Sequence, residues 1–78
     1  MTLNGCVRGL KADLSNPNYN LTCERIMFYR KSDNSVVFRL NGDDIKAFTL
    51  NEDDEYEIEV PVRLTTDDFL AKDWVYEY

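Results

Sequence analysis

Five basic or aromatic side chains in the first half of the chain are suited to binding a phosphate-bearing ligand: Arg8, Lys11, Arg25, Tyr29 and Arg39. Arginine guanidinium groups bind phosphate oxygens through paired hydrogen bonds, and a tyrosine ring offers a face on which a nucleobase can stack. Arg8 and Lys11 are three residues apart, so a helix would place them on one face. Each of the five could equally be an ordinary exposed residue, because charged side chains are mostly solvated.

The sequence contains few residues that could act in catalysis or bind a metal ion. The sequence has no histidine, which excludes histidine-based triads, general bases and zinc sites. Pairs of adjacent aspartates at 43–44, 53–54 and 67–68 sit at predicted turns or at a helix start, and they lack the further oxygen ligands of a calcium loop. No phosphate-binding glycine loop is present. We therefore expect a binding protein that is not an enzyme and that uses no metal or cofactor.

The net charge of −6 is unevenly distributed along the sequence. Residues 1–39 carry a formal charge of +3, and residues 40–78 carry −9. Such asymmetry favours a basic site for an anionic ligand in the first half, head-to-tail contacts between subunits, or an acidic surface that binds a basic protein. The acidic surface would include Glu55, Glu57 and Glu59, which alternate along one predicted strand and could also simply solvate its outer face.

The hydrophobic pattern predicts one helix followed by an antiparallel sheet. Apolar residues at positions 3, 7, 10 and 14 have helical spacing, so we expect a helix over residues 2–13. Gly5 and Gly9 weaken it by about 1 kcal/mol each relative to alanine, and they would allow a strand or a ligand to approach closely. From residue 23 the period changes to two, which predicts strands at 23–30, 36–40, 45–50, 55–62 and 74–78. Asn41-Gly42 predicts a tight turn, and Pro61 places 55–62 at a sheet edge.

Residues 64–74 predict a short helix that leads into the last strand. Thr65 or Thr66 can cap this helix, with Asp68 completing a capping-box-like pair near the positive end of the helix dipole. Phe69 and Leu70 are then expected to face the core.

The segment Asp68 to Trp74, Asp-Phe-Leu-Ala-Lys-Asp-Trp, resembles the D-[LIF]-L-A-x-D-W signature near the C-terminus of a phage protein family. Studied members of that family are Thoeris anti-defence proteins of the second type, which sequester nucleotide signals made by bacterial immune systems. The signature residues here are Asp68, Leu70, Ala71, Asp73 and Trp74, and they are as easily architectural as functional. Two family features differ: the stretch 23–29 lacks a tryptophan, and 60–62 is Val-Pro-Val in place of Trp-x-Pro.

The resemblance implies a phage-type anti-defence protein that binds a cyclic nucleotide or cyclic ADP-ribose-type signal in the host cytoplasm without degrading it. The alternative is an acidic inhibitor, of the anti-CRISPR or DNA-mimic type, that binds a basic host protein through Glu55, Glu57 and Glu59. A small virion or host-modulating protein without a ligand is a third interpretation.

We expect a single α+β domain over residues 1–78: an N-terminal helix packed on a small antiparallel sheet of four to five strands, with a short helix before the C-terminal strand. A chain of this length buries only about 60% of the surface that it exposes when unfolded, so a homo-oligomer is expected. Cys6 and Cys23 are expected to be buried and reduced. No apolar run is long enough to cross a membrane.

Overall fold

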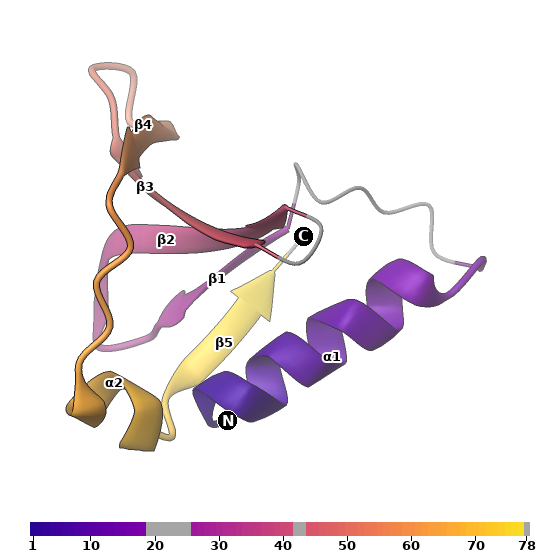
Figure 1. Ribbon diagram of the computed structural model, residues 1–78. Coiled ribbons are helices and arrows are strands. Elements are labelled where there is room, and N and C mark those ends of the chain that lie inside the picture. The colour runs from indigo at the N-terminus through magenta and orange to yellow at the C-terminus, as the bar shows by residue number, and fades with distance from the viewer. Residues whose placement is uncertain (19–25, 42–43, 78) are drawn as a thin grey trace.

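The computed structural model describes residues 1–18, 26–41 and 44–77, and these form the predicted α+β fold. A long helix and a short helix lie on one side of a five-stranded antiparallel sheet with strand order β4-β3-β2-β1-β5 (Figure 1). In chain order the elements are α1 (Leu3–Ser15), β1 (Met27–Arg30), β2 (Asp33–Asn41), β3 (Asp44–Leu50), β4 (Tyr56–Val60), α2 (Thr66–Leu70) and β5 (Trp74–Glu77). Neither helix is long and apolar enough to cross a bilayer.

Helix α1 extends two residues beyond its predicted end. The side chain of Thr2 caps it by accepting a hydrogen bond from the backbone N–H of Gly5 at 3.1 Å. The glycine at position 9 permits the close approach that its place in the sequence predicted, because a Cβ there would lie 3.0 Å from the hydroxyl of Tyr76 on β5. The buried side of the helix consists of Leu3, Cys6 and Leu10.

The core lies between α1 and one face of the sheet. Its centre is a cluster of three aromatic rings, Phe28, Phe38 and Trp74, with ring centroids 5.7 to 6.1 Å apart. Such tilted and offset arrangements are favourable beyond the area that they bury. Trp74 is only 1% exposed and is therefore a core residue.

The strands agree with the alternating pattern, but several bounds differ. The first strand begins at Met27, and residues 23–25 of the predicted segment, like the turn at 42–43, lie outside the described residues. The predicted strand 55–62 is shortened to Tyr56–Val60, since Pro61 cannot donate a backbone hydrogen bond. Strand β4 does lie at the edge of the sheet, as Pro61 predicted.

The prediction that Phe69 and Leu70 face the core is wrong. Their side chains are 58% and 70% exposed. Helix α2 has only five residues and none of them is buried, whereas Leu64 and Ala71, which flank the helix, pack against the core. The side chain of Trp74 fills the space beneath α2 that Phe69 and Leu70 were expected to fill.

Candidate ligand pocket

Arg30 binds two aspartates of the C-terminal segment. Its Nε donates to Asp73 at 3.0 Å, and its terminal nitrogen donates to Asp68 at 3.1 Å. The second carboxylate oxygen of Asp73 accepts the backbone N–H of Ser32 at 3.1 Å. The hydrogen bonds from Ser32, together with Arg30, hold the pKa of Asp73 well below its usual range. The end of β1, the turn before β2 and the segment from α2 to the start of β5 therefore meet at one place, which we call the corner.

Asp68 also completes the predicted capping box of α2. Its carboxylate accepts the backbone N–H of Thr65 at 2.8 Å, and the hydroxyl oxygen of Thr65 accepts the backbone N–H of Asp68 at 3.3 Å. These bonds and the Arg30 pair lower the pKa of Asp68. The indole N–H of Trp74 donates to the backbone carbonyl of Asp68 at 2.7 Å. Asp68 and Trp74 therefore serve the architecture of this corner.

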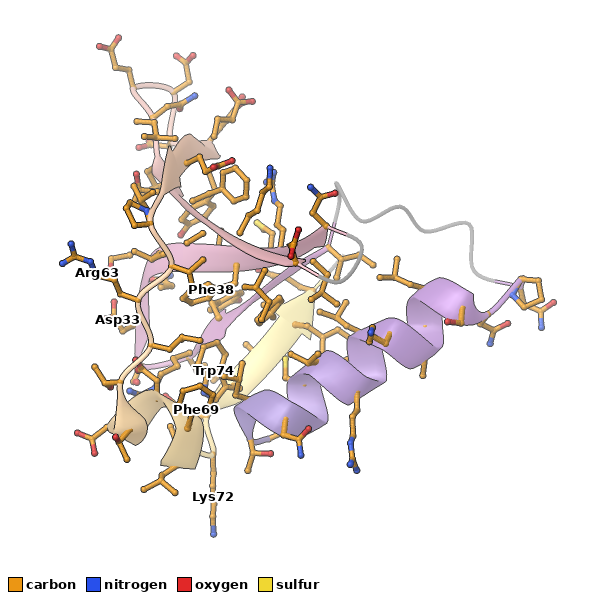
Figure 2. All side chains as sticks on the ribbon, in the orientation of Figure 1. Asp33, Phe38, Arg63, Phe69, Lys72 and Trp74 are labelled. Carbon is orange, nitrogen blue, oxygen red and sulfur yellow. The ribbon has the colours of Figure 1, made fainter. Side chains whose placement is uncertain are left out.

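A pocket of about 400 Å³ opens beside this corner, on the same face of the sheet as α1. Phe38 and Trp74 lie deep in it, whereas Arg63 projects outward near Asp33 (Figure 2). Its apolar and neutral wall is formed by Val36, Phe38, Thr49, Val60, Pro61 and Trp74. Four charged residues also line it, namely Arg30, Asp33, Arg63 and Asp68.

The charges of the pocket provide both donors and acceptors. Asp33 accepts hydrogen bonds from the backbone N–H and hydroxyl of Ser35 at 3.2 and 2.7 Å, which lower its pKa and keep it ionised at neutral pH. Arg30 is oriented by its aspartate partners, and Arg63 is exposed. The pocket thus suits a ligand with a planar apolar part, an anionic group for the guanidiniums and a donor group for the carboxylates.

None of the predicted ligand residues that the structure describes lines this pocket. Arg8 and Lys11 are exposed on α1. Tyr29 and Arg39 alternate with the core residues of β1 and β2, which puts them on the opposite face of the sheet. There the hydroxyl of Tyr29 donates to the carboxylate of Glu77 at 2.9 Å, an interaction that raises the pKa of Tyr29. Arg25 lies outside the described residues.

Arg39 lies against the ring of Phe48, with its guanidinium carbon 4.8 Å from the ring centroid. This is a cation–π contact on the face of the sheet away from α1. The predicted ligand residues are therefore divided between two surfaces. Arg8 and Lys11 lie on the outer surface of α1, and Tyr29 and Arg39 lie on the far face of the sheet.

Sequence analysis missed the arginines of the pocket, although one signal was present. Arg30 follows Phe28 by two residues, so the strand period places it on the core face, where a charge requires partners. Its Cα also pairs with that of Trp74 across β1 and β5. Arg63 follows Pro61 in a segment without regular structure, and no pattern in the sequence pointed to it.

The predicted acidic surface forms an exposed hairpin at the far edge of the sheet. The β3–β4 hairpin extends from the body of the molecule (Figure 1), with Glu55, Glu57 and Glu59 all exposed. The side chain of Glu57 raises the pKa of Glu55, which shows that two carboxylates are crowded together there. Glu59 is paired with Lys46 at 3.5 Å.

Other candidate chemistry is limited in the part of the chain that the structure describes. No group of three or more cysteine, aspartate or glutamate side chains within residues 1–18, 26–41 and 44–77 is arranged to hold a metal ion. Cys6 is a free, buried thiol whose pKa is raised to about 11 by desolvation, so it is protonated and unreactive at neutral pH. Cys23 lies outside the described residues.

Comparison with protein-family models, curated proteins and solved structures gave no match for this chain. The resemblance of residues 68–74 to the anti-defence family stays a prediction from the motif.

Proposed function

We propose that this chain is a binding protein that sequesters a nucleotide-derived signal in the pocket beside Trp74. The observation that carries the proposal is the meeting of aromatic walls and guanidinium groups in one cavity of about 400 Å³. This volume lies in the range of pockets that hold small molecules and cofactors. The motif resemblance supports the same function and implies a phage-type anti-defence role in the host cytoplasm.

Each kind of side chain in the pocket would contact a different part of the ligand. The largely buried rings of Phe38 and Trp74 form the floor of the pocket, and the more exposed Val60 and Pro61 offer apolar contact to a planar base. Arg63, exposed at the opening, binds phosphate oxygens, and Arg30 adds a fixed positive charge at the side. Asp33 accepts a hydroxyl or amino proton of the ligand.

The state of the carboxylates supports sequestration without degradation. The low pKa values of Asp33 and Asp68 make both groups weak bases, because each is already stabilised as an anion by hydrogen bonds. We therefore expect the bound ligand to be released intact when the protein unfolds.

The test is isothermal titration calorimetry with a cyclic ADP-ribose-type ligand and with cyclic oligonucleotides. We expect saturable binding by the wild type and at least about a tenfold loss of affinity in Arg63→Glu, because a phosphate contact becomes a repulsion. Arg8→Glu makes the same charge change on the outer surface of α1 and should leave the affinity unchanged. Heating and filtering the complex should return intact ligand. Equal losses in the two variants, or a degraded ligand, would contradict the proposal.

A second candidate function, inhibition of a basic host protein, is favoured by the crowded carboxylates of Glu55 and Glu57. A basic groove would relieve their repulsion. Replacing Glu55, Glu57 and Glu59 with lysine should then abolish inhibition of the purified target, and salt should slow association with it. Arg63→Glu should leave that inhibition intact, which separates the two functions.

A further inference from the structure

Strand β4 has a hydrogen-bonded neighbour on one side only. It pairs with β3 in the register Phe48 with Glu59 and Thr49 with Ile58, and it is the terminal strand of the sheet within the described part of the chain. An edge strand presents a row of backbone N–H and C=O groups to which another strand can bind. The other edge strand, β5, packs against α1 through the contact of Tyr76 with Gly9.

The side chains of β4 divide into an apolar row and an acidic row. Ile58 is 49% exposed although it is aliphatic, and Val62 just beyond the strand is 41% exposed. Glu57 and Glu59 alternate with Ile58 and point to the other face. An added strand would therefore meet aliphatic contacts on one face and carboxylates on the other.

The charges argue against a second copy of this chain as the added strand. Two β4 strands side by side would bring their glutamates together, and like charges directly opposite one another are destabilising. The raised pKa of Glu55 beside Glu57 shows that repulsion exists within one chain already. Charge complementarity instead favours a strand that carries lysine or arginine on the face next to Glu57 and Glu59.

We propose that β4 binds an extended basic segment of a partner protein by strand addition. The segment alternates aliphatic residues, which contact Ile58 and Val62, with lysine or arginine residues, which pair with Glu57 and Glu59. Backbone hydrogen bonds to the free side of β4 supply affinity, and the alternating side chains supply specificity. Val60 of the same strand lines the pocket and Val62 precedes Arg63, but the contacts proposed for β4 do not require a small ligand in the pocket.

The experiment uses a fluorescent eight-residue peptide of alternating lysine and valine, with binding followed by anisotropy. Three control peptides accompany it: one with the lysines and valines in two blocks, one with glutamate in place of lysine, and one with N-methylated backbone amides. The alternating Lys-Val peptide should bind at least about ten times more tightly than each of the three. Equal binding of the block or N-methylated peptide would overturn strand addition.

Two protein variants locate the site. Glu57→Lys/Glu59→Lys should lose affinity for the Lys-Val peptide and gain affinity for the Glu-Val peptide. An unfolded variant could not show this reversal. Glu52→Lys/Asp53→Lys changes the charge equally at the hairpin turn and should keep most of the affinity. Similar losses in both variants would mean diffuse attraction to the acidic hairpin and would overturn the proposal. Arg63→Glu, which removes the proposed phosphate contact of the pocket, should keep the preference for the alternating Lys-Val peptide over the block peptide, so failure here is distinguishable from failure of the pocket.

Discussion

Two acidic regions of this molecule use their carboxylates in opposite ways. At the corner formed by α2 and the start of β5, Asp68 and Asp73 accept hydrogen bonds from Arg30 and from backbone N–H groups, and their pKa values are lowered. In the β3–β4 hairpin, Glu55 faces Glu57, and its pKa is raised. Asp68 and Asp73 thus stabilise the fold as hydrogen-bonded anions, whereas the charge of Glu55 is opposed by that of Glu57.

The largest expected effect concerns the core of the corner. Trp74→Ala should lower the free energy of unfolding by about 3 to 5 kcal/mol, because it removes a fully buried ring and leaves a cavity. Phe69→Ala is the matched control, since that ring is 58% exposed, and it should cost about 0.5 kcal/mol or less. Urea denaturation followed by circular dichroism measures both. Similar losses in the two variants would contradict the placement of these rings.

The next prediction concerns the oligomeric state and the surface through which two copies of the chain would contact each other. We propose a homo-oligomer whose contact uses the exposed side chains of Phe69 and Leu70 on α2, since clustered exposed apolar groups mark interaction surfaces. Light scattering at micromolar concentration should show a dimer or larger species that Phe69→Ser/Leu70→Ser converts to a monomer. A monomeric wild type would reject the proposal, and an oligomer retained in the variant would move the contact elsewhere.

The dependence of folding stability on acidic pH provides a further test of the comparison. Because the pKa values of Asp68 and Asp73 are lowered in the folded state, their stabilisation is present above about pH 4 and is lost as the pH falls through the folded values. Arg30→Met should lower the urea midpoint at pH 7 and flatten its decline below about pH 4. Lys46→Met removes the positive charge that pairs with the more exposed Glu59, and it should change both quantities much less. Equal effects would show that burial of the Arg30 cluster contributes little.

The smallest effect on stability is expected for the β3–β4 hairpin, where a substitution should stabilise the protein. The raised pKa of Glu55 means that its charge destabilises the folded state at neutral pH, and acidification through that pKa relieves the repulsion. Glu57→Gln should therefore raise the melting temperature slightly at pH 7, and the difference should shrink towards pH 4. A lower melting temperature at pH 7 would mean that Glu57 has a stabilising contact that outweighs the repulsion, such as its hydrogen bond from Asn51.

Local chemistry alone determined much of the fold. The spacing of apolar residues predicted α1, the two-residue period predicted the strands, and Pro61 predicted the sheet edge. The capping box of Thr65 and Asp68 was readable because its two partners are three residues apart. In each case the signal comes from residues that are neighbours along the chain.

The pocket and the corner were decided only by tertiary structure. Arg30 meets Asp68 and Asp73 across 38 and 43 residues of sequence, so no local pattern pairs them. Phe69 is exposed because Trp74 already fills the space beneath a five-residue helix, and this competition for volume exists only once the strands are assembled. Charge and aromatic character were visible in the sequence, but the face on which each side chain would lie depended on how the sheet packed.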